Sequence, residues 1–470
     1  MPAKTPLFII VTALALSCGL LSIVTPAAAQ GSETVIYSFC DNSPACPDGA
    51  FPYAGLTMDA SGNVYGTTYG GGGGMGCNGS GCGSVFRLRP SAVTTTGMWG
   101  EKVLHGFLSF LSDGFYPESA VTLDHAGNIY GTTWAGGLAS SGCNIYGCGT
   151  VFKLTPNADD EWAETIIYDF CAKASCTDGA GPVAGLIFDA AGNLYGATAT
   201  GGTVDQRCAY GCGTIFELSP GAKGSWTEKV LYRFSYAEGA NPLASLVFDS
   251  AGNLYGTTAQ GGTNGIGTVF KLAPGANGTW TETTLHIFDT TDGRVPQSSL
   301  IIDKAGNLYG TTFLGGTGAG CLYSYGCGTV FEVSPGSNGT WTEQVLHNFC
   351  AAAFCADGSN PWGGLVADGN GVLYGTTYEG GENNVGILFR LTFNTTWSES
   401  LVYTFGSIYY DAWNSQAGLI VDAHGNLYGT GEYGGLSTNC NNFQSCGAVF
   451  RFDPGIAAKP NVDHGLNGTP

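Results

Sequence analysis

Aromatic, amide and carboxylate side chains occupy two loop positions that differ from one repeated segment of this sequence to the next. The first position follows a proline, or Ser415 in the last copy, and the second follows a Gly-Thr-Thr run or its variant. Aromatic faces stack on the C–H faces of sugar rings, while amides and carboxylates bond to hydroxyl groups. The pattern indicates a carbohydrate site, unless the rings only pack beneath the loops. The candidates are Tyr53, Glu118, Gln297, Trp362 and Gln416 at the first position, Tyr69, Trp134, Phe313 and Tyr378 at the second, and Arg294 and Trp413 upstream of the first.

Carboxylates in the same loops allow a second chemistry. Glycosidases place two acidic side chains about 5 to 10 Å apart around the bond that they cleave. Four loop acids lack a full set of counterparts in the other copies, namely Glu118, Glu379, Glu432 and Asp205. A polysaccharide-acting enzyme, glycosidase-like or lyase-like, is therefore the alternative to a binding protein, although the sequence does not bring any two of these acids together.

Histidine chemistry is disfavoured. His105, His286 and His347 share one strand position with tyrosines of the other copies, so we expect them to be structural. The loops then lack a histidine for a Ser-His-Asp triad or for a catalytic metal centre.

An acidic residue also recurs in the loop that leads into each copy. On a ring-shaped fold these residues would surround the mouth of the central channel and attract a cation such as calcium, or a basic ligand. A feature present in every copy is more often a turn residue, so no cofactor is expected, and calcium stays a weak alternative. The set is Asp48, Asp113, Asp178, Glu238, Asp292, Asp357 and Asp411.

The cysteines after Cys18 number sixteen and fall into close pairs. Zinc sites prefer a gap of two residues and two pairs per ion, whereas these gaps are three to five residues and the pairs belong to different copies. An even count at such spacings predicts disulfides in an exported chain. The predicted pairs are Cys40–Cys46, Cys77–Cys82, Cys143–Cys148, Cys171–Cys176, Cys208–Cys212, Cys321–Cys327, Cys350–Cys355 and Cys440–Cys446.

Repeated segments must position these loops. Each reads close to Gly-Asn-Leu-Tyr-Gly-Thr-Thr, and each copy divides into four strand-like runs, which in the fifth copy are 299–303, 307–312, 329–333 and 341–349. Such units predict an all-β, seven-bladed β-propeller of four-stranded blades. Residues 33–39 match the fourth run and should close the ring by joining the last blade, which removes exposed sheet edges. The copies begin at Gly62, Gly127, Gly192, Gly252, Gly306, Gly371 and Gly425.

Strand alternation separates two faces of this propeller. Tight Asp-x-x-Gly-Asn turns, in which aspartate accepts backbone hydrogen bonds and glycine supplies a positive φ, lie on one face. The long loops with the cysteine pairs lie on the other, where we expect binding because a rigid scaffold holds them. Gly310 is expected to let neighbouring blades approach, and Tyr309 to fill the space between sheets.

Composition excludes two classes of partner. The net charge is −20 and only 16 residues are basic, which argues against nucleic acid and against anionic membrane surfaces. Residues 1–29 contain Lys4, the apolar run 7–24 and three alanines before Gln30, which predicts a secretory signal peptide. The propeller is then expected over 30–455, with a flexible tail at 456–470 and no membrane span in the mature chain.

The pattern D-x-x-G-N-L-Y-G-T-T…G-G…G-T-V-F-K-L…W-x-E-x-x-L-x-x-F over residues 33–455 resembles the choice-of-anchor tandem repeat GloVer-containing family of exported bacterial proteins. The resemblance implies a secreted or surface protein and no assigned reaction. The turn and its strand are also similar, more weakly, to NHL and gluconolactonase-like propeller repeats, which concerns the fold alone. We therefore expect a secreted or surface-exposed binding or adhesion scaffold, whose ligand is a carbohydrate or other surface polymer on the disulfide-stapled loop face.

Overall fold

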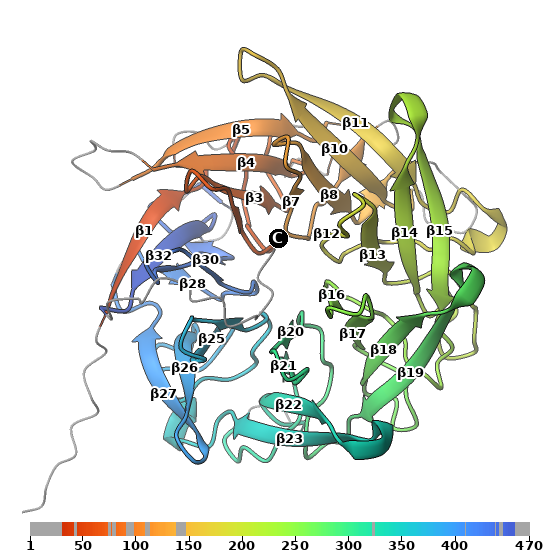
Figure 1. Cartoon of the computed structure of the whole chain (residues 1–470). Helices are drawn as coiled ribbons and strands as arrows, with labels where there is room; N and C mark the ends of the chain where they lie inside the picture. Colours follow the sequence, from red (N-terminus) through yellow and green to blue (C-terminus); the bar gives the residue numbers. More distant parts are fainter. Residues whose placement is uncertain are drawn as a thin grey trace, which may run out of the picture.

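The computed structural model describes residues 31–41, 45–73, 77, 81–90, 98–108, 113–137, 147–321, 325–408, 410–437, 439–440 and 445–455. Its four-stranded antiparallel sheets stand around a common axis as the blades of a seven-bladed β-propeller (Figure 1). The fold class is therefore as predicted. The expected signal peptide and C-terminal tail lie outside the described residues. No helix among the described residues is long and apolar enough to cross a membrane.

Each blade runs from a short inner strand at the propeller axis to a long outer strand at the rim (Figure 1). Blades 1 to 3 are β2 (Thr57–Met58), β3 (Val64–Thr68), β4 (Ser84–Arg89) and β5 (Gly100–Gly106); β7 (Thr122–Leu123), β8 (Ile129–Thr133), β10 (Thr150–Pro156) and β11 (Trp162–Asp169); and β12 (Ile187–Phe188), β13 (Leu194–Thr198), β14 (Thr214–Pro220) and β15 (Trp226–Arg233). Blades 4 to 6 are β16 (Val247–Phe248), β17 (Leu254–Thr258), β18 (Thr268–Pro274) and β19 (Trp280–Ile287); β20 (Ile301–Ile302), β21 (Leu308–Thr312), β22 (Thr329–Pro335) and β23 (Trp341–Asn348); and β24 (Val366–Ala367), β25 (Leu373–Thr376), β26 (Ile387–Phe393) and β27 (Trp397–Thr404).

The N-terminal strand closes the ring. Blade 7 is built from β29 (Ile420–Val421), β30 (Leu427–Gly431), β32 (Ala448–Asp453) and β1 (Ser32–Ser38). Strand β1 pairs with β32 in antiparallel register from Ser32 with Asp453 to Ser38 with Ala448. The outer strand of the last blade thus comes from the start of the chain, as the sequence predicted, and this pairing covers an edge that would otherwise be open.

Short elements complete the loops. Two small strand pairs join β6 (Gly114–Phe115) to β9 (Ala135–Gly136) and β28 (Ala412–Trp413) to β31 (Tyr433–Gly434). The described residues also form five 3-10 turns, which are η1 (Ala174–Cys176), η2 (Ala222–Gly224), η3 (Ala276–Gly278), η4 (Ser337–Gly339) and η5 (Ala353–Cys355).

The turn between the two inner strands explains the repeated Asp-x-x-Gly-Asn. In blade 5, Asp303 Oδ1 accepts hydrogen bonds from the backbone N–H groups of Ala305 and Asn307, both at 2.9 Å. Its Oδ2 accepts from the Asn307 amide at 2.8 Å and from the Tyr309 hydroxyl at 3.2 Å. Both carboxylate oxygens therefore accept hydrogen bonds. Such surroundings stabilise the ionised carboxylate itself and do not suit a bound cation. Asp59, Asp124, Asp189, Asp249 and Asp422 repeat this arrangement.

Phenylalanines pack the space between blades. Phe288, which follows the outer strand of blade 4, packs edge-on against Phe331 of blade 5, with ring centroids 5.0 Å apart. Tyr309 of blade 5 packs against Trp397 of blade 6, with ring centroids 6.0 Å apart. A Cβ atom at Gly310 would lie 2.7 Å from the Phe331 ring. Gly310 therefore makes room for a ring of its own blade, which corrects the expectation that it serves the approach of a neighbouring blade.

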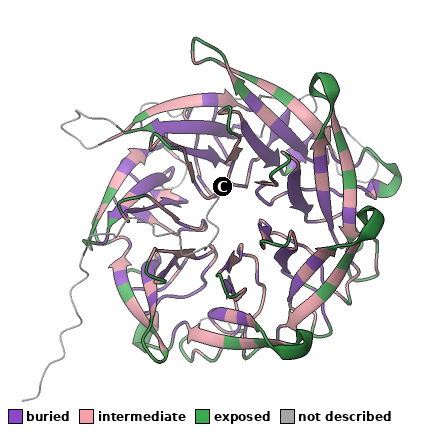
Figure 2. Cartoon of the chain, in the orientation of Figure 1, coloured by how far each residue is buried: buried purple, intermediate pink, exposed green. Residues whose placement is uncertain are grey.

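The burial of each strand depends on its position in the blade. The second and third strands of the blades are almost entirely buried, whereas the outer strands alternate and the outer hairpin tips are exposed (Figure 2). The long loops meet on one face, because bridges join the loop before each blade to the loop after its second strand, as in Ala50 with Gly70 and Arg294 with Leu314. The scaffold thus presents one face of long, cross-bonded loops.

Candidate functional site

A backbone clamp holds the two candidate loop positions together in every blade. The residue before the loop proline adopts a positive φ, for example 57° at Asn360. Its N–H donates to the Cys327 carbonyl of the preceding blade at 2.7 Å, and its carbonyl accepts from Tyr378 N–H at 3.0 Å. The same two bonds recur at Phe51, Tyr116, Gly181, Asn241, Val295 and Asn414. The clamp fixes the loops to each other across the blade seams.

Small residues bring the first candidate position close to the propeller axis. A Cβ atom at Gly55 would lie 3.6 Å from Ala120 of the next blade, and one at Gly185 would lie 2.7 Å from the Ser245 hydroxyl. Each of these residues comes two positions after the first candidate position, so the candidate side chains surround the axis on the loop face. The small residues are Gly55, Ala120, Gly185, Ser245, Ser299, Gly364 and Gly418.

Four aromatic rings form a continuous band over blades 1 and 2. The rings of Tyr53 and Tyr69 lie 5.0 Å apart, and Tyr69 stacks on Tyr116 at 4.3 Å with an angle of 9° between the planes. Trp134 follows at 6.5 Å from Tyr116 and is 37% exposed. A Cβ atom added at Gly181 would lie 3.4 Å from the indole nitrogen, so the absence of a side chain there leaves this edge of Trp134 open.

A second aromatic group lies over blades 5 and 6. Trp362 packs edge-on against Phe313 at 4.7 Å and lies 5.9 Å from Tyr378. The Tyr378 hydroxyl donates to Glu432 Oε2 at 3.1 Å, and Gln416 Nε2 donates to the same oxygen at 2.6 Å. Glu432 is 4% exposed, so blade 7 supplies a buried carboxylate where most other blades carry an aromatic ring.

Glu432 joins the two groups, because its charge also raises the pKa of the Tyr53 phenol, after the larger effect of burial. We call the resulting surface the aromatic arc. It consists of Phe313, Trp362, Tyr378, Glu432, Tyr53, Tyr69, Tyr116 and Trp134. Blades 3 and 4 interrupt it, since their equivalent positions carry Val183, Ala199, Leu243 and Ala259.

Glu118 gives the arc an acid with unusual titration. Burial raises the pKa of Glu118 to about 7. Burial, with the charge of Glu118 and the neighbouring Tyr116 as further causes, raises the pKa of Tyr69 to about 12. Glu118 and Glu432 therefore influence opposite ends of the Tyr53–Tyr69 pair. At neutral pH, Glu118 can either donate a proton or accept a hydrogen bond from a hydroxyl.

Two predicted site residues adjoin the arc, Gln416 through Glu432 and Glu118 through Tyr69. Three others lie outside it. The Arg294 guanidinium lies over the Tyr325 ring at 4.6 Å. Trp413 pairs with Tyr433 between β28 and β31. Gln297 is at the first candidate position, and its Nε2 is shielded from solvent without a hydrogen-bond partner among the described residues.

The recurring acids do not surround the channel mouth, which corrects that expectation. Asp48 accepts hydrogen bonds from the Tyr37 hydroxyl and from Cys40 N–H, both at 2.9 Å, and Tyr37 lies on the outermost strand of blade 7. Asp178 and Asp411 bind the outer-strand hydroxyls of Tyr168 and Tyr403 at 2.8 Å. These residues, with Asp113, Glu238, Asp292 and Asp357, cap the end of each outer strand because the loop turns back there.

A second acid, which sequence reasoning missed, faces each of these loop acids from the next blade. In the seam between blades 6 and 7, burial and then the charge of Asp411 raise the pKa of Glu33 to about 9. Burial raises the pKa of Glu399 to about 7 in the seam beside Asp357. The sequence signal was a constant spacing, because each outer strand carries this glutamate four residues before its tyrosine or histidine. In blade 2 a β-bulge separates the two positions, so Glu164 faces blade 1 while Tyr168 faces blade 3. The full set is Glu33, Glu101, Glu164, Glu228, Glu282, Glu343 and Glu399.

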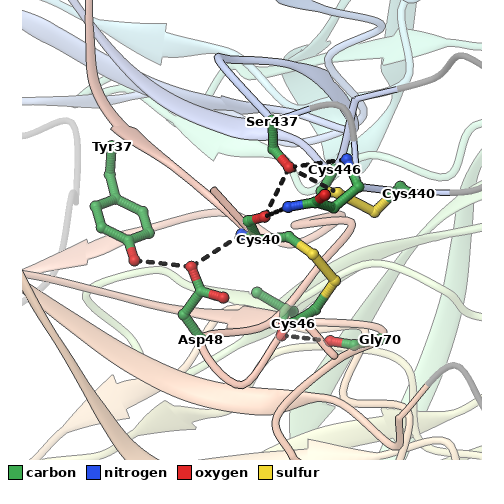
Figure 3. The surroundings of a disulfide bond; sticks show 10 residues. Tyr37, Cys40, Cys46, Asp48, Gly70, Ser437, Cys440 and Cys446 are labelled. Atoms are coloured by element: carbon green, nitrogen blue, oxygen red, sulfur yellow. Dashed lines mark hydrogen bonds between the residues drawn. A yellow bond between two sulfur atoms is a disulfide. The ribbon is translucent and has the colours of Figure 1, made fainter. Parts of the chain in front are cut away.

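The disulfides staple the loop face. Seven predicted pairs are bonded, and Cys148 is also in a disulfide while Cys143 lies outside the described residues. Figure 3 shows Cys40–Cys46 beside Cys440–Cys446, with the Ser437 hydroxyl bonded to the Cys40 carbonyl at 2.7 Å. Pairs from distant parts of the chain therefore do meet, which the argument from separate repeats did not anticipate. Their role as disulfides is unchanged.

Tyr116 is the arc residue that sequence reasoning did not select. It lies directly before Pro117, two positions upstream of Glu118, where the other copies carry phenylalanine, glycine, asparagine or valine. Its positive φ of 58° turns the ring toward Tyr69. A comparison of this third loop position among the copies would have found it.

Comparison with known proteins identifies a family. No curated protein matches the chain. Among solved structures, the PQQ-bound form of aldose sugar dehydrogenase from Streptomyces coelicolor matches with a TM-score of 0.40 and 11% identity, over 90% of this chain and 99% of that chain. A similarity of this size says nothing about function. The model of the Gloeobacter/Verrucomicrobia repeat matches residues 137–352 and 322–466, which together exceed half of the sequence. The chain therefore belongs to the Gloeobacter/Verrucomicrobia repeat family.

Proposed function

We propose that this protein is a secreted or surface-exposed scaffold that binds a carbohydrate or another hydroxyl-rich surface polymer along the aromatic arc. The observation that carries the proposal is the band Tyr53–Tyr69–Tyr116–Trp134, in which consecutive rings lie 4.3 to 6.5 Å apart and end at a partly exposed indole. Apolar ring faces next to Glu118 match the alternating C–H faces and hydroxyls of a sugar chain.

The surroundings of the arc favour binding by a rigid surface. The seam clamps fix both candidate positions of every blade through backbone hydrogen bonds, and disulfides close the neighbouring loops. A preformed site loses less conformational entropy when a ligand binds. Multiple disulfides are also compatible with an extracellular protein.

A glycan panel tests the proposal. Wild-type protein should retain at least one plant or bacterial polysaccharide. Tyr69→Ala should weaken that affinity about tenfold, because an aromatic contact contributes about 0.5–1.5 kcal/mol beyond the buried area. Trp134→Ala should weaken it by a similar factor. Tyr210→Ala is the matched control, since Tyr210 is an aromatic residue of a blade 3 loop, 80% exposed and outside the arc. The absence of any ligand, or equal losses in all three variants, would contradict the proposal.

A polysaccharide-acting enzyme is the second candidate, and Glu118 is the observation that favours it. A carboxyl group with a pKa of about 7 suits a general acid at neutral pH, and Glu432 lies beyond the Tyr53–Tyr69 pair as a second carboxylate. Release of reducing ends or of unsaturated products from the polysaccharide retained by the panel, abolished by both Glu118→Gln and Glu432→Gln, would establish the enzyme. Binding without turnover would leave the scaffold.

A further inference from the structure

The seam between blades 1 and 2 holds a cluster of three potential metal ligands, two of which are on outer strands. His105 lies on the outer strand β5, Asp113 in the loop that follows it, and Glu164 on the outer strand β11 of blade 2. His105 Nε2 is 3.5 Å from Asp113 Oδ2 and 3.7 Å from Glu164 Oε1. One ligand atom of each residue lies within 4.8 Å of the others.

These distances suit an ion between the groups better than direct hydrogen bonds. A charge-assisted bond between an imidazole and a carboxylate is about 2.7–2.9 Å long. Ligands placed about 2.0–2.2 Å from a tetrahedral zinc ion are roughly 3.4 Å from one another. Both His105 distances are near the second value.

Each of the three residues has a buried polar atom without a partner, which is an observation independent of the spacing. Asp113 is 8% exposed. Its Oδ1, His105 Nε2 and Glu164 Oε1 are each shielded from solvent and have no hydrogen-bond partner among the described residues. Asp113 Oδ2 accepts from Leu108 N–H at 3.0 Å, which orients the carboxylate. Unpaired buried polar atoms are costly, so three at one place indicate that something satisfies them.

We propose that His105, Asp113 and Glu164 bind one divalent transition-metal ion of the zinc class at the seam between blades 1 and 2. A neutral imidazole nitrogen with two carboxylate oxygens is a donor set of such ions, whereas calcium and magnesium favour oxygen ligands alone. When both are ionised, Asp113 and Glu164 carry two negative charges, which one divalent ion neutralises. The ion ties adjacent outer strands together and is structural in role.

The other seams provide the comparison within the molecule. His286 Nε2 is bonded directly to Asp292 Oδ2 at 3.0 Å, which leaves less room for an ion beside Glu343. His347 is 3.3 Å from Asp357. The remaining seams carry a tyrosine at the histidine position, namely Tyr37, Tyr168, Tyr232 and Tyr403. Three unpartnered ligand atoms of three residue types occur together, within the described part of the chain, at the seam of blades 1 and 2.

Metal titration of the full chain, purified without a histidine tag and stripped with chelator, tests the site. Calorimetry should give one zinc ion per chain, and cobalt should produce the visible absorption of a low-symmetry site. His105→Tyr should lower zinc affinity by at least about 100-fold, because loss of an outer-shell partner alone costs about 10–100-fold. Tyrosine stands at this position in four other seams, so this variant is expected to fold. Its thermal unfolding without metal checks this.

His286→Tyr is the matched control and should leave zinc affinity unchanged. Glu164→Gln is a second variant that removes a ligand with little change of shape, and it should lose affinity as well. The proposal is overturned if the wild type takes up no zinc or cobalt, if binding survives both His105→Tyr and Glu164→Gln, or if His286→Tyr abolishes it.

Discussion

The two faces of the propeller are built from the same repeat, yet they differ in how strictly the repeat is kept. On the turn face, Asp249 accepts four hydrogen bonds from Ala251, Asn253 and Tyr255, and five other blades repeat this arrangement. On the loop face, the position after the Gly-Thr-Thr run carries rings in four blades, alanine in two and Glu432 in the seventh.

The difference separates framework from candidate site. A residue that every blade needs for the same hydrogen bonds cannot vary without a loss of stability. Its uniformity among the blades therefore indicates a structural role. A residue whose backbone is held by the seam clamp can vary freely, so its variation is available for recognition. Substitutions on the turn face should therefore change stability and leave binding intact, while those in the aromatic arc should do the reverse.

Asp249→Ala should give the largest effect on stability. The substitution leaves four donors of one turn without their acceptor, and hydrogen bonds to a charged group contribute about 1.5–3 kcal/mol each, less where water replaces the carboxylate. The melting temperature should fall by several degrees, measured by circular dichroism, while glycan affinity stays that of the wild type.

Asp368→Ala provides the internal control for this prediction. Asp368 stands in the variant Asp-Gly-Asn-Gly turn of blade 6, where its recorded donors are the Asn370 and Val372 backbone N–H groups and a longer contact of 3.4 Å from the Asn370 amide. Its loss should lower the melting temperature less than Asp249→Ala. Equal losses would mean that the tyrosine hydroxyl contributes nothing to the turn.

The fold could be predicted from the sequence because the same pattern of turns and strands recurs seven times along the chain. The Asp-x-x-Gly-Asn turn, the strand residues after it and the unmatched run 33–39 together imply blades and a ring closed by β1, and the structure has both. The role of Gly310 could not be read, because the ring that it accommodates belongs to Phe331, which lies 21 positions later and reaches it only through strand pairing.

Glu33→Gln should change the pH dependence of stability. Burial and then Asp411 raise the pKa of Glu33 from 4.5 to about 9 in the folded protein. The folded state therefore binds more protons than the unfolded state between these values, so stability is full below pH 4.5 and is lost as the pH rises toward 9. The melting temperature of Glu33→Gln should exceed that of the wild type at pH 8, and the difference should shrink at pH 5.

Glu382→Gln is the control for charge alone, since Glu382 is exposed. It should leave the wild-type pH dependence in place. Because Glu33 belongs to a set repeated in every seam, glycan affinity should be unchanged in both variants. A loss of glycan affinity in Glu33→Gln would contradict the assignment of stability to the repeated positions and of binding to the varied ones.

The candidate site could be predicted only in part. Tyr53, Tyr69 and Trp134 could be selected as candidates because equivalent positions of the copies can be compared directly. Their order in space could not be found, since Tyr69 meets Tyr116 across a blade seam and 47 positions along the chain. The acidic ring was misplaced for the same reason, because the hydrogen bond from Tyr37 to Asp48, and not the repeat pattern, holds the loop at the rim.

Glu118→Gln should give the smallest effect on binding. With a pKa of about 7, Glu118 is mostly protonated at pH 6 and mostly ionised at pH 8. An ionised acceptor forms hydrogen bonds roughly twice as strong as a neutral one, so wild-type affinity for a retained glycan should rise a few-fold between these values, as measured by calorimetry. Glu118→Gln should show no such rise. Because burial raises the pKa of Glu118 in the folded protein above its unfolded value, the variant should melt above the wild type at pH 8, and this difference should shrink at pH 5. A rise that persists in the variant would assign the titration to another group and remove Glu118 from the arc's binding surface.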